Sequence, residues 1–212
     1  QKATAEILRV ISGARSDVQP VFETIAAAAL RLCKAVSTNV FTFDGELIHL
    51  ATYVNTNPAY GDELRRLFPR PPNRDLAVTR AMLTGEVVQI PDVSEDPDYM
   101  KGTHSRIGGF RSNLAVPLLR DGRPIGAVVV GRPEPGPFPD TQVSLLQTFA
   151  EQAVIAIENV RLFNEVQSRN RDLTEALEQQ MATSEILRVI SQSPTDVQPV
   201  FDTIAAAALK LC

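Results

Sequence analysis

The sequence predicts an α+β fold in which antiparallel hairpins lie between helices. Two observations predict the hairpins: Asp44-Gly45 divides the β-rich run "NVFTFDGELIHLATYV", and Asp121-Gly122 divides "SNLAVPLLRDGRPIGAVVVG". An Asp-Gly pair between two such runs is typical of a two-residue hairpin turn. The third observation is a stretch without Pro or Gly that starts at residue 141 and predicts a helix over 141–191. Such a helix would be about 75 Å long, which is more than one domain can cover.

Shorter elements fill the rest of the chain. Residues 17–33 predict a helix with Asp17 as its N-cap, and 59–68 and 75–84 predict two short helices. The segment "EVVQI" predicts a short strand, and residues 91–111 predict a long polar loop or loose helix. Loops of this length inside a compact domain are usually functional or mobile.

The first hairpin is expected to present two largely apolar faces, so that the sheet is covered on both sides. A two-residue loop pairs Phe43 with Glu46. One face then carries Phe41, Phe43, Ile48 and Leu50. The other carries Val40, Thr42, Leu47, His49, Ala51 and Tyr53, whose scattered polar groups could line a small cavity.

Composition excludes several classes of partner. The chain is 44% hydrophobic and 22% charged with a net charge of −4, and it has no basic block, so we expect neither nucleic acid nor membrane contact. No apolar run approaches the length of a membrane span. Cys33 and Cys212 occupy the same position of an internal repeat, so they do not indicate a disulfide or a metal site. These features fit a reducing, cytoplasmic setting.

The internal repeat predicts the domain organisation. Residues 1–33 and 180–212 are identical at 25 of 33 positions, with a constant offset of 179. A period of this length spans a whole domain plus a connector, because solenoid units repeat every ~20–50 residues. We therefore expect the end of a linker helix at 1–16, a domain at 17–166, a coiled-coil signalling helix at 167–192, and the opening helix of a second, truncated copy at 193–212.

A seven-residue pattern in the long helix predicts the coiled coil. Val166, Leu173, Gln180 and Leu187 fall at one core position, and Arg169, Ala176, Thr183 and Ile190 fall at the other. Half of this seam is polar, which suits a dimeric coiled coil of marginal stability. A solvated linker helix is the alternative.

The segments "LAVPLLRDGRPIGAVVVGR" and "FPDTQVSLLQTFAEQAVIAIENVRLFNEV" strongly resemble a GAF domain of the type found in bacterial multidomain sensor proteins. The shared features are the strand ending in "VPL", the acidic-Gly turn, "IG" at the start of the next strand, and the exit helix. The resemblance covers residues 17–166. It implies a mostly antiparallel sheet of about six strands, with the terminal helices on one face. Small helices and the long loop would close a possible ligand pocket on the other face.

The same resemblance implies a regulatory, sensory module of a cytoplasmic signal-transduction protein. Tandem arrays of this kind usually lead to a histidine kinase of a two-component phosphorelay, and less often to a nucleotide cyclase. The chain itself contains no nucleophile–base pair or P-loop, so we predict no catalytic residue in it. A purely structural dimerisation module is the alternative. An empty, polar-lined cavity behind the 91–111 loop would favour sensing, and aromatic side chains filling it would favour a structural role.

The resemblance also limits the cofactor. The residue set of cyclic-nucleotide-binding GAF domains has no match here, so cyclic nucleotides are not expected. Bilin-binding members use a Cys followed by His, but Thr103 stands before His104, so covalent bilin is not expected either. The carboxylates of "EDPDY" do not match a calcium loop, and we predict no metal site. The sequence does not identify a ligand.

If a ligand binds, we expect it between the second hairpin face and the 91–111 loop, where polar groups meet an apolar wall. The candidate contacts are Thr42, His49, Tyr53, Tyr99, His104, Arg111 and Asn113. We also expect a parallel homodimer through the terminal helices, with residues 3–12 and 141–166 as the main contact. Both segments carry more apolar surface than one sheet face can cover.

Overall fold

The computed structural model describes residues 17–100, 102–192, 201 and 205. The predicted linker helix at 1–16, the contact through 3–12 and nearly all of the second-copy helix at 193–212 lie outside these residues. The chain divides into two compact units, residues 1–160 and 161–212, and each is described by itself. This division falls earlier in the long helix than the predicted domain boundary at 166/167.

The first unit has ten elements in the described residues, and the last of them continues into the second unit. They are α2 (Gln19–Leu32), β1 (Ser37–Phe43), β2 (Ile48–Asn55), α3 (Pro58–Leu67), α4 (Ala77–Thr84), β3 (Val88–Ile90), α5 (His104–Gly108), β4 (Ser112–Arg120), β5 (Arg123–Arg132) and α6 (Asp140–Gln192). The predicted helices and strands are therefore present. One detail differs: Val18, not Asp17, is the N-cap of α2, although the Asp17 carboxylate accepts a hydrogen bond from the Gln19 N–H at 2.9 Å.

The strands form one antiparallel sheet in the order β2-β1-β5-β4-β3. It has five strands within the described residues, where about six were expected. A sixth strand could pair with the outer edge of β2, but only a single β-bridge is present there among the described residues. In this bridge Ile48 and Arg70 exchange backbone hydrogen bonds of 2.8 and 3.2 Å. Arg70 is flanked by Pro69, Pro71 and Pro72, which have no N–H to donate, so pairing cannot extend into a sixth strand.

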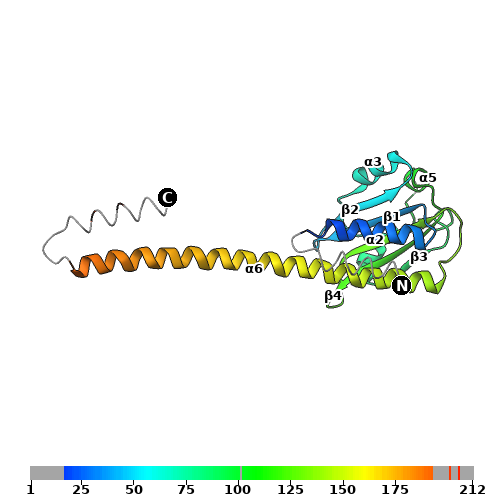
Figure 1. Cartoon of the computed structure of the whole chain (residues 1–212). Coiled ribbons are helices and arrows are strands. Elements are labelled where there is room, and N and C mark those ends of the chain that lie inside the picture. The colour runs from blue at the N-terminus through cyan, green and yellow to red at the C-terminus, as the bar shows by residue number, and fades with distance from the viewer. Residues whose placement is uncertain (1–16, 101, 193–200, 202–204, 206–212) are drawn as a thin grey trace. The chain divides into compact units, whose positions relative to one another are not determined.

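Each face of the sheet has its own core (Figure 1). On one face α2 and the first part of α6 pack against residues of β1, β4 and β5. On the other face α3, α4, α5 and the loop before α5 cover the sheet. The expected division, with the terminal helices on one side and the small helices on the other, is thus confirmed for the described residues.

The first hairpin differs from the predicted register. Phe43 pairs with Ile48 and not with Glu46, so the loop spans residues 44–47. The Asp44 carboxylate stabilises this wider turn, because its Oδ1 accepts hydrogen bonds from the N–H groups of Glu46 and Leu47 at 2.9 and 2.7 Å. These bonds hold the pKa of Asp44 well below its usual range. The second hairpin matches the prediction, with Asp121 and Gly122 both at positive φ.

A β-bulge further along β2 changes which residues share a face. Phe41 pairs with Leu50 but Val40 pairs with Thr52, so Ala51 is the extra residue. Beyond the bulge the alternation of side chains is inverted. As a result Tyr53 packs in the same core as Phe41, whereas the sequence alone grouped it with Val40.

Within the described part of the chain, no helix has both the length and the apolar character that crossing a bilayer requires.

Candidate ligand pocket

A small cavity lies between the sheet and the short helices. Its walls come from β1, β4 and β5 on one side and from α3, α4, α5 and the preceding loop on the other. Its volume is about 20 Å³. This is enough for one water molecule, which needs roughly 10–15 Å³, and far below the roughly 300–1,000 Å³ of small-molecule sites.

Aromatic side chains account for the small volume. The Tyr99 and His104 rings are stacked with centroids 5.5 Å apart. Phe110 packs edge-on against His104 and Tyr60, at 5.8 and 6.3 Å. Gly108 permits this arrangement, because a Cβ there would lie 2.7 Å from both the Tyr60 and the Phe110 rings.

The polar groups around the cavity are buried and neutral. Asn39 Nδ2 donates to the Tyr60 hydroxyl at 2.9 Å, and the Tyr99 hydroxyl and His104 Nε2 are hydrogen-bonded at 3.0 Å. Burial raises the pKa of Tyr60 to about 12 and holds the pKa of Tyr99 well above its usual value. Burial lowers the pKa of His104 to about 4. At neutral pH the pocket therefore offers uncharged donors and acceptors.

Two of these polar atoms have no hydrogen-bond partner. They are Asn39 Oδ1 and His104 Nδ1, and both residues line the cavity. Leaving a buried polar atom unsatisfied is unfavourable by about 1–3 kcal/mol. A water or a small polar ligand between the aromatic rings would satisfy such atoms.

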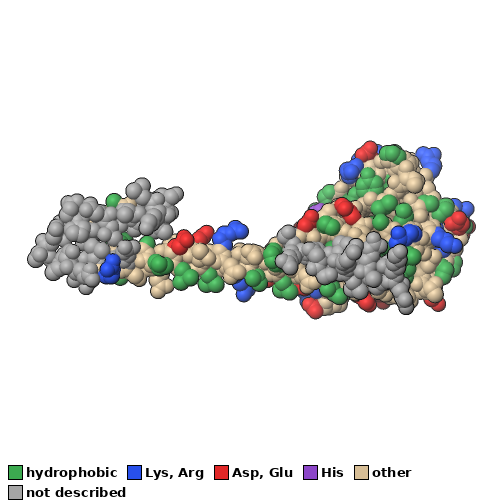
Figure 2. Space-filling model, viewed as in Figure 1, with side chains coloured by type: hydrophobic (Ala, Val, Ile, Leu, Met, Phe, Trp, Pro, Cys, Tyr) green, Lys and Arg blue, Asp and Glu red, His purple; other side chains and the backbone are tan. Residues whose placement is uncertain are grey.

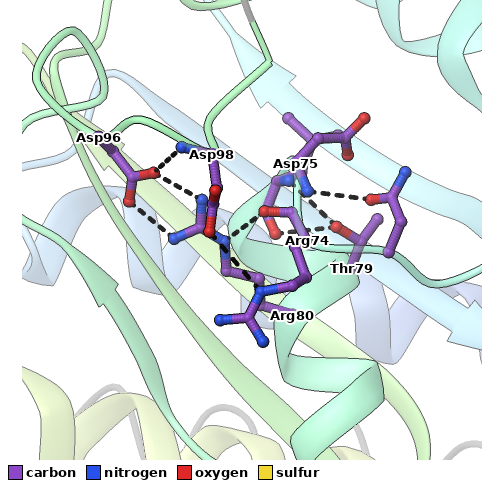
Figure 3. Close-up of polar contacts among 8 residues, drawn as sticks. Arg74, Asp75, Thr79, Arg80, Asp96 and Asp98 are labelled. Carbon is purple, nitrogen blue, oxygen red and sulfur yellow. Dashed lines mark hydrogen bonds and ion pairs between the residues drawn. The ribbon is translucent and has the colours of Figure 1, made fainter.

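The loop that closes the cavity is attached to α4 by ion pairs (Figure 3). The Arg80 guanidinium contacts both Asp96 carboxylate oxygens, at 2.7 and 2.8 Å, and its Nε donates to the Arg74 carbonyl at 2.5 Å. The Arg80 interaction lowers the pKa of Asp96. Further along the loop, the Met100 N–H donates to the Asp75 carbonyl at 2.8 Å. We call residues 91–100, 102 and 103 the covering loop.

A family model of GAF domains matches residues 15–158, which is more than half of the chain. The chain belongs to the GAF domain family. No curated protein matches it.

Solved structures share this GAF fold at low sequence identity. The free methionine-R-sulfoxide reductase of Neisseria meningitidis, solved with its substrate, has a TM-score of 0.62 and 21% identity over 76% of this chain and 93% of that chain. A domain assigned to a two-component sensor histidine kinase of Sinorhizobium meliloti 1021 has a TM-score of 0.57 and 16% identity over 72% and 98%. A methyl-accepting chemotaxis protein, residues 122 to 287, has a TM-score of 0.60 and 23% identity over 76% and 99%.

The GAF pocket brings together three of the seven predicted contacts. Tyr99, His104 and Asn113 all line the cavity. Their convergence follows from the topology, since the start of β4 lies beside α5 and the covering loop. Whether they bind a ligand stays a prediction.

The other four predicted contacts lie elsewhere, because the covering loop lies over the opposite hairpin face from the one expected. Thr42 is half-buried on the Val40 side of β1, where α2 and α6 pack. His49 is paired with Asp44 at 2.7 Å beside the hairpin turn. Arg111 is half-exposed and forms an ion pair with Asp92. Tyr53 is on the pocket side of the sheet but packs against Tyr60 and under Arg65.

Sequence reasoning missed Asn39, Tyr60 and Phe110 as pocket residues. Asn39 had a usable signal, because a polar residue two positions before Phe41 shares its strand face. Glu63 was also missed. It is buried at the pocket margin, where it accepts a hydrogen bond from Thr103 Oγ1 at 3.3 Å and pairs with Arg66. No sequence pattern marks Glu63 as different from its exposed neighbours.

A second, open groove of about 430 Å³ follows the outer edge of β2. Two predicted contacts, His49 and Tyr53, line it together with Gln19, Leu50, Ala51, Thr52, Arg65, Phe68 and Pro69. The groove is separate from the small cavity and shares only Phe68 with it. Among the described residues, no group of three or more His, Cys, Asp or Glu side chains is placed to hold a metal ion.

Proposed function

We propose that this GAF domain is a regulatory, sensory module of a signal-transduction protein. The observation that carries the proposal is the pair of unsatisfied buried atoms, Asn39 Oδ1 and His104 Nδ1, under the covering loop. A cavity of about 20 Å³ admits no ligand larger than water, so a larger ligand must displace side chains that line it, and Tyr99 of the covering loop is one of them. Ligand binding is thereby coupled to a change in the loop and in the elements it touches.

A purely structural dimerisation module is the competing function. The aromatic packing of Tyr60, Tyr99 and Phe110 favours it, because these rings fill most of the space that a ligand would occupy. The unsatisfied Asn39 and His104 atoms favour sensing, since they leave hydrogen-bonding groups free for a ligand among the aromatic rings.

We further propose that the module is a cytoplasmic homodimer that relays its signal through its helices. The part of α6 inside the first unit leaves Ile155 exposed, opposite the face that packs on the sheet. The parent protein would be a sensor histidine kinase of a two-component phosphorelay, with a nucleotide cyclase as the alternative. Fold similarity to a domain assigned to a sensor histidine kinase supports the first parent.

Native mass spectrometry of freshly purified protein tests the sensory role. We expect a dimer that retains a small molecule, and we expect His104→Phe to lose the added mass. Arg111→Gln is the matched control, because Arg111 lies outside the cavity, and it should keep the added mass. A dimer without added mass in any sample would favour the structural module. Phosphate incorporation from ATP by the full-length parent separates a kinase from a cyclase.

A further inference from the structure

The second unit carries a row of exposed apolar side chains on α6. Large hydrophobic residues stand in water at Leu162, Val166, Leu173, Leu177 and Met181, with exposed fractions between 46% and 71%. Figure 2 shows hydrophobic side chains along this part of the helix. Such a row is unfavourable in water and indicates a surface that another molecule covers.

The row follows a seven-residue repeat in a different register from the predicted one. Val166 and Leu173 are seven residues apart, and so are Asn170 and Leu177. Alternating steps of four and three residues along 166, 170, 173 and 177 are the spacing of a coiled-coil seam. Phe163 and Leu187, which are 37% and 60% exposed, continue the same spacing, and Leu162 and Met181 flank it.

One asparagine lies inside this seam. Asn170 stands between Val166 and Leu173, and its side chain is exposed. A single polar residue inside an apolar helix seam sets the register and number of helices at some loss of stability.

The register predicted above, with Arg169 and Ala176 as core positions, fits the side chains less well. It places Arg169 inside the seam and leaves Leu177 outside it. Arg169 is instead engaged on its own helix, where it pairs with Glu165 at 2.6 Å, and Glu165 also pairs with Arg161 at 3.0 Å. This ladder of charges runs beside the apolar row and leaves the row itself uncharged.

We propose that a second copy of this chain covers the row, in parallel and in register, with Asn170 facing its own counterpart. The inference rests on the proposed homodimer and specifies its contact. A parallel two-fold arrangement places each residue against itself, so Leu meets Leu. An Asn amide, with both donor and acceptor atoms, can pair with an identical amide. The row is thus self-complementary. A helix of unrelated sequence would not provide the matching residue at each position.

Cysteine crosslinking of the full chain tests the seam. Cys212→Ser removes one native thiol, and Cys33 can stay because it is buried and burial raises its pKa to about 11. Single cysteines are compared in adjacent pairs: Asn170→Cys against Arg169→Cys, and Leu177→Cys against Ala176→Cys. Diamide oxidises two facing thiols to a disulfide and is itself reduced to the hydrazine. Only side chains whose Cβ atoms approach within about 4.5 Å can form the bond.

We expect covalent dimer to form several-fold faster at residues 170 and 177 than at 169 and 176. The reverse order would restore the predicted register, with Arg169 and Ala176 in the seam, and overturn the proposal. Slow crosslinking at all four positions, with a dimer by light scattering, would place the dimer contact elsewhere and overturn the seam alone. A monomer by light scattering at tens of micromolar would overturn both the seam and the proposed homodimer.

Discussion

Arg80 of α4 and Asp96 of the covering loop form a two-pronged ion pair, with N–O distances of 2.7 and 2.8 Å and side-chain exposures of only 17% and 19%. Because Arg80 also donates to the Arg74 carbonyl, it connects α4, the segment before α4 and the loop through one guanidinium. The loop residue Tyr99 follows Asp96 closely and stacks on His104 in the pocket. The ion pair therefore holds in place the segment that fills the cavity.

Arg80→Met should loosen the covering loop and destabilise the domain by about 1–3 kcal/mol, because it leaves the half-buried Asp96 carboxylate unpaired. Urea unfolding measures the loss, and hydrogen exchange should rise over residues 91–100. Arg74→Met is the matched control: Arg74 is 77% exposed and lies 3.6 Å from Asp98, so its loss should change stability by less than about 1 kcal/mol. Equal effects of both substitutions would contradict the assigned role of Arg80.

Stability should fall as the pH drops from about 6.5 to about 4, because of His104. Its pKa is about 4 in the folded protein and about 6.5 when unfolded, so between these values the unfolded chain binds the extra proton. The neutral ring thus stabilises the fold above pH 6.5, and this contribution, up to about 3 kcal/mol, is lost as the pH falls through that window.

Urea unfolding at a series of pH values checks this slope. His104→Gln should flatten it, since an amide does not titrate. His49→Gln is measured in parallel, because His49 is the other histidine of the chain and lies outside the cavity. A slope that survives in His104→Gln would assign the pH dependence to other groups.

Gly108→Ala should destabilise the pocket by about 1–3 kcal/mol through overpacking. The new methyl group would meet two buried rings, Tyr60 and Phe110, at 2.7 Å. Gly102→Ala is the matched control, since its nearest neighbour is the flexible Met100 side chain at 3.8 Å. Thermal unfolding compares the two variants, and an unchanged melting temperature for Gly108→Ala would show that the rings can move apart freely.

Local chemistry made most of the fold predictable from sequence. Asp121-Gly122 produced the expected two-residue turn, because both residues adopt the positive φ that this turn needs. Asp44-Gly45 did not, because the Asp44 side chain bonds to the N–H groups of Glu46 and Leu47 and favours a wider loop. The competition between a backbone turn and a side-chain-bonded turn depends on tertiary context, which a sequence pattern does not contain.

The candidate site was less predictable than the fold. The bulge at Ala51 reverses the faces of β2, and the covering loop lies on the side of Phe41 and Tyr53. Tyr99 and His104 were predicted because polar groups of the long loop were expected to meet an apolar wall. Asn39 was missed because it shares the strand face of Phe41, and a ligand was expected on the other face. Pockets form from residues that are distant in sequence. A single error in the predicted strand register therefore assigns several of these residues to the wrong face of the sheet.

Asn170→Leu should strengthen the dimer, with a dissociation constant lower by a factor of several to about ten, if Asn170 lies in the seam between two helices. Replacing a polar seam residue by an apolar one adds buried apolar surface while removing the amide pair that specifies the register. Arg169→Leu is the adjacent control, and it should change the dissociation constant little, because Arg169 pairs with Glu165 beside the seam. Sedimentation equilibrium measures both constants.

With Leu177→Cys added, Asn170→Leu should also form more crosslinked species of altered register, since the amide that selected the parallel, in-register dimer is gone. A stronger gain from Arg169→Leu than from Asn170→Leu would place Arg169 at the contact and support the register predicted from the sequence.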